Sequence, residues 1–334
     1  MAIIEERQEL QDDVDMDEEQ INTSALFKVE DVTNATKCSN FNKGLGPDCF
    51  DGNVVKKDGY LNGKLMVEIT DALNSANLPE YLRIGRLVPL QKSASKGPVA
   101  LDDIRPIIVR SHVSKIMEKA ILEKINTTRP HVIASKVYQT GFKEGKSTAI
   151  HASRLLHEVH GRKKRRFNLL VDLQKAYDSV DRQILWSLLR ARCKNQQEKS
   201  LIELIVKLHN ESTIQVGMYN INAEMGLPQG SVLSPVLFNV YLEEALKSSV
   251  KLEAVRRRGD LLAFADDMLV MTDNQNELAM IIDELSKLEE QWNLRLNKKK
   301  SEILTKEKVQ EVGGVRCVKV VKYLGVKVTC DRQE

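Results

Sequence analysis

The amino-acid sequence predicts an α+β protein in which an antiparallel sheet is backed by helices. Apolar runs of strand length alternate with longer segments of helical periodicity, and no repeat of fixed period is present. Hydrophobic residues make up 42% of a chain of 334 residues, which is enough for a sizeable core. A wholly disordered protein is therefore excluded.

The first half of the chain, up to about residue 166, mixes short apolar runs with loop signals. Arg86–Leu90 is predicted to be a short strand between two loops, 44–48 and 92–98, that are rich in Gly, Pro or Ser. Apolar residues recur at helical spacing between residues 111 and 125, and this spacing predicts a helix.

The second half of the chain is more regular. Its predicted elements are, in order, a strand at 167–171, helices at 182–193 and 197–209, an apolar run at 261–271, an amphipathic helix at 275–292 and strands at 301–304 and 318–328. Asn274 and Glu277 have the spacing of a capping box at the start of the amphipathic helix. This order of elements is typical of an α+β domain whose helices cover one face of the sheet.

Charge is distributed unevenly along the chain. The net charge is only +3, but residues 1–20 contain nine acids and one base, which leaves +11 for the remainder. Residues 1–24 are predicted to be an acidic, flexible tail. The basic remainder favours a polyanionic partner such as nucleic acid.

Cysteine usage and hydropathy exclude further classes of protein. The five cysteines are scattered without a C-x-x-C pair, which argues against a disulfide framework and a zinc knuckle and fits a reducing compartment. No signal peptide is apparent at the N-terminus. The longest uncharged run, 225–242, approaches membrane-span length but contains Pro228, Pro235 and Gly230, so we interpret it as a buried functional segment of a soluble protein without a membrane partner.

Three acids stand in otherwise apolar runs. Asp172 ends one run, and Asp266 and Asp267 interrupt another. A charge in a buried strand is costly unless it is paired or bound to a cation. Taken singly, either motif is equally consistent with a turn, but together they favour three carboxylates at one edge of a sheet. Such a cluster suits Mg²⁺, or alternatively Mn²⁺, and two such ions can act on a phosphoryl transfer.

These residues also carry a family resemblance. Phe264-Ala265-Asp266-Asp267 resembles the [YF]-x-D-D box of reverse transcriptases, and further motifs accompany it in order. They are Gly46–Asp48, Leu87–Lys92, Ile104–Ile107, Tyr138–Phe142, Val171–Asp181, Gly226–Pro235, Asn297–Ser301 and Tyr323–Gly325. The set is most similar to the enzymes of non-LTR retrotransposons and group II introns.

The resemblance implies an RNA-directed DNA polymerase built as a right hand. Fingers would occupy residues 25–166 and a palm with an RRM-like or ferredoxin-like sheet would occupy 167–334. The chain has nine residues after Gly325, too few for the duplex-holding thumb. A thumb would therefore come from a protein partner or from a further C-terminal region. The implied partners are an RNA template, a DNA primer and dNTPs.

The resemblance also implies metal and catalytic roles. Asp172 and Asp266 would bind two Mg²⁺ ions, together with the Leu173 carbonyl, while Asp267 would add negative charge. Lys300 would orient the triphosphate or protonate the leaving pyrophosphate. An alternative for Lys300 is a solvated surface position among neighbouring lysines.

The remaining implied roles concern nucleotide and primer binding. Tyr177 would exclude a 2′-hydroxyl from the incoming sugar. Gln229 and Gly230 would line the nucleotide pocket, and Lys92 and Arg105 would contact the triphosphate. Tyr323, Leu324 and Gly325 would form the primer grip.

Three functions remain open at this point. The first is a catalytic reverse transcriptase core, the second a non-catalytic relative that binds nucleic acid or serves as a scaffold, and the third an RNA-dependent RNA polymerase with a similar palm. The basic run 162–166 would contact template, serve as a nuclear localisation signal or form a solvated loop. A retroelement enzyme is expected in the nucleus or the cytoplasm, and a group II-like enzyme in an organelle.

Overall fold

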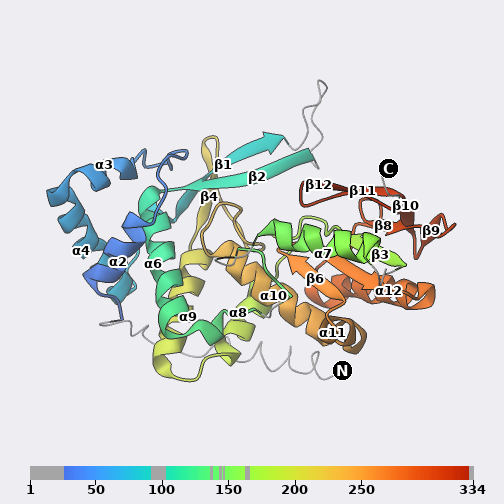
Figure 1. The fold of residues 1–334 in the computed structure, drawn as a ribbon. Helices are drawn as coiled ribbons and strands as arrows, with labels where there is room; N and C mark the ends of the chain where they lie inside the picture. Colours follow the sequence, from blue (N-terminus) through green and yellow to red (C-terminus); the bar gives the residue numbers. More distant parts are fainter. Residues whose placement is uncertain are drawn as a thin grey trace.

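The computed structural model describes residues 26–91, 103–135, 138–142, 145, 147–161 and 166–330. The predicted tail, most of the basic run and Lys92 lie outside the described residues. Helices α2–α4 gather at one end of the molecule and the largest sheet lies at the other, with α6 and α9 between them (Figure 1). Within the described residues, none of the helices combines the length and the apolar character needed to cross a bilayer.

The N-terminal part combines helices with a four-stranded sheet. Its elements are α2 (Val29–Lys37), α3 (Gly52–Lys57), α4 (Gly59–Ser75), α5 (Glu80–Arg83), β1 (Ile84–Gln91), β2 (Ile104–Arg110), α6 (His112–Thr128), the 3₁₀ helix η3 (Pro130–Val132) and α7 (Thr148–His160). Strands β4 (Thr213–Val216) and β5 (Tyr219–Asn222) complete the sheet in the order β2-β1-β4-β5.

The C-terminal part contains a six-stranded sheet of order β6-β7-β3-β8-β10-β9 and a separate two-stranded sheet, β11-β12. Its strands are β3 (Phe167–Val171), β6 (Leu261–Phe264), β7 (Asp267–Thr272), β8 (Glu302–Thr305), β9 (Glu311–Val312), β10 (Val315–Val318), β11 (Val320–Tyr323) and β12 (Val326–Thr329). Its helices are α8 (Arg182–Ala191), α9 (Gln196–Asn210), α10 (Ser234–Ser248), α11 (Val250–Arg257) and α12 (Gln275–Trp292).

Both faces of the six-stranded sheet are covered, because its central strands alternate between two cores. Leu169 and Val270 belong to the main core that α10 and α12 also enter. Leu269 and Met271 point the other way, into a smaller core shared with α7 and the β11–β12 hairpin. This alternation is the period-two pattern of a strand buried on both sides. The sequence predicts helices on one face of the sheet, whereas α7 also covers the second face.

The α+β class and the regular elements of the second half are confirmed. Asn274 caps α12 as expected, since its side chain accepts from the backbone N–H groups of Asn276 and Glu277. The strand predicted at 318–328 is divided by a turn at Leu324–Gly325 into β11 and β12. The boundary between fingers and palm at residue 166 stays a prediction.

Candidate active site

Three carboxylates lie where β3 and the β6–β7 hairpin end at the same edge of the large sheet. β3 pairs antiparallel with β7, and Val171 lies opposite Met268, so Asp172 follows β3 beside Asp267 at the start of β7. Asp266 belongs to the tight turn between β6 and β7. We call residues 264–267 the acidic turn. The register brings together the three acids that the sequence singled out.

The three carboxyls influence one another through their charges. Burial raises the pKa of Asp266 above its usual range, and the charge of Asp172 adds to this shift. Loss of water contact and repulsion from Asp266 and Asp172 raise the pKa of Asp267 to about 6. Asp267 stays among the exposed residues, so we attribute more of its shift to like-charge repulsion than to burial. Arg105 opposes both shifts. Bound cations would relieve this repulsion.

Asn297 and Ser301 hold Asp172 in place. The Asn297 side-chain amide donates to Asp172 Oδ2 (2.8 Å), and the Asp172 backbone N–H donates to the Ser301 hydroxyl (3.0 Å). Leu173 faces Leu296 in an antiparallel bridge whose hydrogen bonds belong to the flanking residues. The Leu173 carbonyl therefore points away from Leu296. A metal ligand at this position requires that orientation.

The segment 138–142 pairs with the edge strand β6 and clamps the acidic turn. The Gln139 side chain accepts from the Ala265 backbone N–H (2.9 Å) and donates to the Ala265 carbonyl oxygen (3.1 Å). A Cβ on Gly141 would lie 2.4 Å from the Ala265 nitrogen, so a glycine is required at this close approach. Ala265 itself has a left-handed backbone, with φ at 56°. The clamp fixes a turn that an alanine adopts only under constraint.

Asp172 and Asp266 fit a hard divalent cation that takes its other ligands from phosphate or water. Within the described residues, no three His, Cys, Asp or Glu side chains form a complete metal site by themselves. Mg²⁺ in polymerases is usually held by one or two carboxylates together with substrate phosphates. The acidic edge therefore suits an ion that arrives with a nucleotide, and Mn²⁺ prefers the same oxygen ligands.

Gln229 and Gly230 lie in the segment 226–235, which packs against β2 and whose last two residues begin α10. We call this segment the 226–235 loop. The Ile108 backbone N–H donates to the Gln229 carbonyl oxygen (2.7 Å). A Cβ on Gly230 would lie 2.3 Å from the Ile108 carbonyl oxygen, and Gly230 has φ at 129°, so glycine is needed for two reasons. The Gln229 side-chain amide donates to Asp178 (3.3 Å). The loop therefore joins β2 to the segment that follows Asp172.

Tyr177 lies between this loop and the acidic turn. Its ring stacks on Phe238 of α10, with centroids 4.8 Å apart. Its carbonyl oxygen accepts from the Leu227 backbone N–H (2.8 Å). Burial raises the pKa of the Tyr177 phenol, and the charge of Asp266 adds to the shift. This position fits the sugar-contacting role that the sequence predicts.

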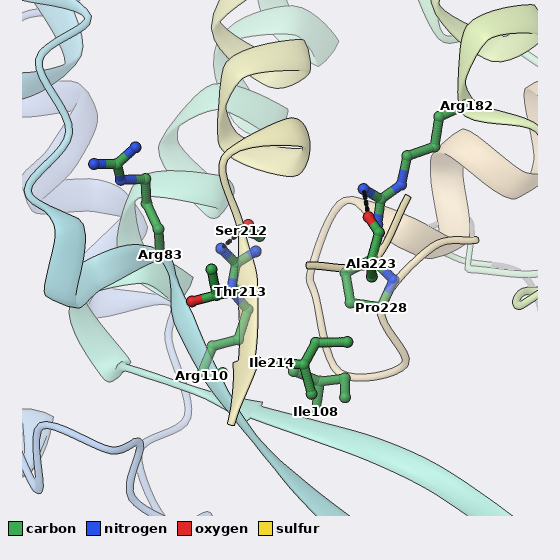
Figure 2. A pocket seen from close by; sticks show the side chains of 10 residues that line it. Arg83, Ile108, Arg110, Arg182, Ser212, Thr213, Ile214, Ala223 and Pro228 are labelled. Carbon is green, nitrogen blue, oxygen red and sulfur yellow. Dashed lines mark hydrogen bonds between the residues drawn. The ribbon is translucent and has the colours of Figure 1, made fainter. Parts of the chain in front are cut away.

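The buried side chain of Arg182 supports the first end of the 226–235 loop. Its guanidinium donates to the carbonyl oxygens of Gly226 (2.6 Å) and Ala223 (2.5 Å). Figure 2 shows Arg182 on one side of a cavity, with Pro228 beside it and Arg110 on the other side. The cavity has a volume of about 10 Å³, so it is a packing gap and not a nucleotide pocket.

Arg110 and Glu118 support the second end of the loop. Both side chains are buried, and Arg110 Nη1 lies 2.6 Å from Glu118 Oε1. Arg110 also donates to the Ser212 hydroxyl (2.9 Å), a contact drawn in Figure 2. The other carboxylate oxygen of Glu118 accepts from the Val232 backbone N–H (2.6 Å). One carboxylate therefore neutralises a buried arginine and fixes the loop.

The predicted phosphate-binding residues are placed unequally. Arg105 is exposed on β2, close enough to the acidic turn for its charge to lower the pKa values of Asp266 and Asp267. Lys300 is exposed, and its backbone N–H donates to the Asn297 carbonyl oxygen (3.1 Å). The structure thus associates Arg105 with the carboxylates, whereas the role of Lys300 stays a prediction.

The predicted primer grip is the turn of the β11–β12 hairpin. Leu324 and Gly325 both have left-handed backbones, with φ at 47° and 87°. Tyr323 is buried, and burial together with the charge of Asp267 raises the pKa of its phenol. The hairpin turn therefore lies within electrostatic reach of the acidic turn.

A comparison with known families decides the classification. The model of the family described as reverse transcriptase (RNA-dependent DNA polymerase) matches residues 91–328, which include every carboxylate above. The chain belongs to the reverse transcriptase family. This membership accounts for the order of motifs from Arg105 to the Tyr323 turn.

Similar proteins agree with this family. The RNA-directed DNA polymerase from the mobile element jockey of Drosophila melanogaster is 24% identical over 91% of this chain and 35% of its own length. The Pol polyprotein from the type-2 retrotransposable element R2DM of the same species is 24% identical over 71% of this chain and 22% of its own length. This reverse transcriptase chain therefore spans about a third or less of these relatives.

A solved structure supports the fold. The apo telomerase of Candida tropicalis, truncated from its C-terminal domain, superposes with a TM-score of 0.53 and 16% identity, covering 76% of this chain and 54% of that one. At this identity the likeness shows a shared fold only.

Several supporting residues were not singled out from the sequence. Asn297 belongs to the Asn297–Ser301 motif, in which the family resemblance implies a role for Lys300 and none for Asn297. Glu118 shows a usable signal, because it is a charged residue among the apolar positions of a buried helix. His151 has no such signal, since isolated histidines occur in many buried helices. Its contacts come from residues distant in the sequence.

Proposed function

We propose that this chain is the catalytic core of an RNA-directed DNA polymerase that adds dNTPs to a primer 3′-hydroxyl on an RNA or DNA template. The observation that carries the proposal is the carboxylate edge of Asp172, Asp266 and Asp267. Its acids repel one another and have Arg105 as the basic group acting on two of them. Carboxylates that repel one another destabilise the fold, so they are expected at a functional site and not in a protein that serves only as a scaffold.

Each part of the edge has a role in the proposed reaction. Two Mg²⁺ ions bound by Asp172, Asp266 and the Leu173 carbonyl would lower the pKa of the primer hydroxyl and neutralise charge on the leaving pyrophosphate. Asp267 adds negative charge that holds these cations. Arg105 neutralises the triphosphate, with Lys92 and Lys300 as further phosphate-binding residues. The Leu324–Gly325 turn holds the primer end.

Selection of the sugar is assigned to Tyr177. Its ring is held against Phe238, so it cannot withdraw freely from the space between the acidic turn and the 226–235 loop. A fixed ring below the sugar leaves no room for a 2′-hydroxyl, which is the group that distinguishes NTPs from dNTPs. Gln229 and the backbone at Gly230 form the adjoining wall.

Partners and location complete the proposal. The matched relatives extend well beyond the region that this chain covers. We therefore assign the duplex-holding thumb to another part of the polymerase, in the same chain or in a partner. A retroelement enzyme of this type acts in the nucleus or the cytoplasm, with an organelle as the alternative.

Primer extension on an RNA template tests the proposal. With Mg²⁺, the chain should incorporate dNTPs, and Asp266→Ala should reduce the rate by roughly a thousandfold or more, because a metal ligand is lost. Asp71→Ala, which removes an exposed acid from α4, is the matched control and should leave the rate unchanged. Tyr177→Ala should weaken discrimination against NTPs.

The alternatives give different results. Preferential incorporation of NTPs by the unaltered chain would indicate an RNA-dependent RNA polymerase. Template–primer binding without synthesis, even after a thumb domain is supplied, would contradict catalysis and favour a scaffold. A binding affinity that does not fall with salt would contradict contact between the basic body and a nucleic-acid backbone.

A further inference from the structure

His151 connects three of the motifs although it belongs to none of them. It lies in α7 and is only 1% exposed. Its ring contacts Thr140 in the clamp segment, Phe264 in the acidic turn and Tyr323 at the hairpin turn of β11–β12. A buried polar ring with contacts to three separate motifs is a candidate for fixing their relative positions.

The first two contacts join His151 to the acidic turn. His151 Nε2 lies 2.5 Å from the Thr140 hydroxyl, and the Thr140 backbone N–H donates to the Ala263 carbonyl oxygen on β6 (3.0 Å). The ring also meets Phe264 edge to face, at 5.9 Å between centroids and 81° between planes. This geometry is favourable for an aromatic pair. A shift of His151 would therefore displace the end of β6 through two residues, Ala263 and Phe264.

The third contact joins His151 to the predicted primer grip. His151 Nδ1 lies 3.3 Å from the Tyr323 hydroxyl, and Leu324 and Gly325 follow directly. The hairpin otherwise packs on α7 through apolar side chains such as Val321, Val328 and Leu155. Apolar packing holds the hairpin in place but is not directional. The hydrogen bond between His151 and Tyr323 adds a defined position along the interface.

The protonation states suit an uncharged chain of hydrogen bonds. Burial lowers the pKa of His151 and raises that of Tyr323, so both side chains are neutral near pH 7. A neutral imidazole donates at one nitrogen and accepts at the other, and a hydroxyl can do either. Thr140, His151 and Tyr323 therefore form an uncharged chain of two hydrogen bonds between the segment 138–142 and the β11–β12 hairpin.

We propose that His151 is a positioning residue that sets the separation between the acidic turn and the primer-grip turn. It thereby sets where the primer 3′-hydroxyl meets the metal ions. This inference rests on the proposed polymerase function. The nucleotide pocket of Tyr177, Gln229 and Gly230 is held by a different set of contacts. A loss of His151 should therefore slow the chemical step without weakening nucleotide binding.

Steady-state single-nucleotide incorporation by the full chain tests the inference. His151→Leu should lower kcat by roughly tenfold, because a small displacement of reacting groups is costly, while KM for the dNTP stays within about twofold. His157→Leu is the matched control, since His157 is an exposed histidine of the same helix, and it should change neither constant. Tyr323→Phe keeps the ring and should reproduce part of the loss in kcat.

The double variant identifies the route. If His151 acts through Tyr323, then Tyr323→Phe should cost less kcat in the His151→Leu background than in the unaltered chain. Additive losses, or a rise in KM without a fall in kcat, would overturn the inference. If His151→Leu does not fold, the inference is tested with Tyr323→Phe, whose kcat should be lower than that of the control His157→Leu. Equal kcat values for these two variants would overturn it.

Hydrogen exchange separates this inference from the proposed function. In His151→Leu, amide exchange should accelerate at Ala265 and at Gly325 together, and should stay unchanged at Val232 in the 226–235 loop. Unchanged exchange at both turns would contradict the positioning role. If the unaltered chain never extends a primer, the polymerase proposal is contradicted instead. The exchange result still tests whether His151 positions the two turns.

Discussion

Two groups of charges flank the 226–235 loop, and they are built in opposite ways. On one side, Arg110 and Glu118 are almost completely buried and paired at 2.6 Å. On the other side, Asp172, Asp266 and Asp267 repel one another. A paired charge deep in the protein satisfies itself, whereas a cluster of like charges needs a ligand. The first group positions the loop, and we infer that the second is left for metal and substrate.

Removal of Glu118 gives the largest expected change in stability. Glu118→Ala leaves Arg110 buried without its carboxylate and the Val232 N–H without its acceptor, so it should destabilise the fold by about 3–5 kcal/mol. Urea denaturation measures this loss. Glu123→Ala on the same helix removes a half-exposed acid that lies 3.9 Å from Lys119 and serves as the control. Its cost should stay near 0.5 kcal/mol.

Substitution of Glu118 should also affect nucleotide binding, because Glu118 holds the 226–235 loop. If Glu118 acts by holding Val232, then Glu118→Gln, which keeps an oxygen acceptor, should raise KM for the dNTP less than Glu118→Ala. Equal stability of Glu118→Ala and Glu123→Ala would show that the buried pair contributes nothing beyond a surface contact. The distinction between the two charge groups would then be lost.

Removal of an acid from the unpaired cluster should have the opposite sign. The folded pKa of Asp267, about 6, lies above the ordinary value of 3.8, so folding favours the protonated acid. The stability from this group is present below about pH 4 and is lost as pH rises through about 6. In metal-free protein, the melting temperature of Asp267→Asn should therefore exceed that of the unaltered chain increasingly between pH 4 and pH 7.

Mg²⁺ supplies the matching control for this pH experiment. A cation at the acidic edge binds the ionised carboxylates, so saturating Mg²⁺ should raise the melting temperature of the unaltered chain more at pH 7 than at pH 5. Asp71→Asn removes an exposed acid from α4 and leaves the acidic edge intact, so this variant should respond to Mg²⁺ as the unaltered chain does. A pH-independent difference for Asp267→Asn would mean that its charge is not repelled by its neighbours.

Sequence patterns predicted the unpaired group better than the paired one. Asp172, Asp266 and Asp267 interrupt apolar runs, and the antiparallel register of β3 with β7 then places them together. The paired group is less evident, because Arg110 lies in no interrupted apolar run and Glu118 shows only as one charged residue among the apolar positions of α6. Glu118 reaches Val232 across 114 positions, and spacing along the chain contains no information about such a contact. Short-range periodicity likewise predicted α12 fully.

The departures from prediction have the same cause. A single strand was expected at 318–328, because the apolar pattern continues through the turn. Leu324 adopts a left-handed backbone, which is unusual for a leucine and cannot be predicted from its residue type. Gly325 is the one residue of this pair whose type favours a turn. His151 was missed because Thr140, Phe264 and Tyr323 meet only after α7 packs on the second face of the sheet. Tertiary packing decides these features.

An exposed pair gives the smallest expected effect and separates burial from pairing. Arg190 forms two contacts to Glu203, at 2.7 and 2.8 Å, which is close to ideal geometry, but its side chain is 47% exposed. Arg190→Ala should cost less than about 1 kcal/mol by urea denaturation, because water screens the charges in both states. A cost near that of Glu118→Ala would mean that geometry matters more than burial. A small cost would instead support burial as the reason that the Arg110–Glu118 pair contributes more to stability than an exposed pair of similar geometry.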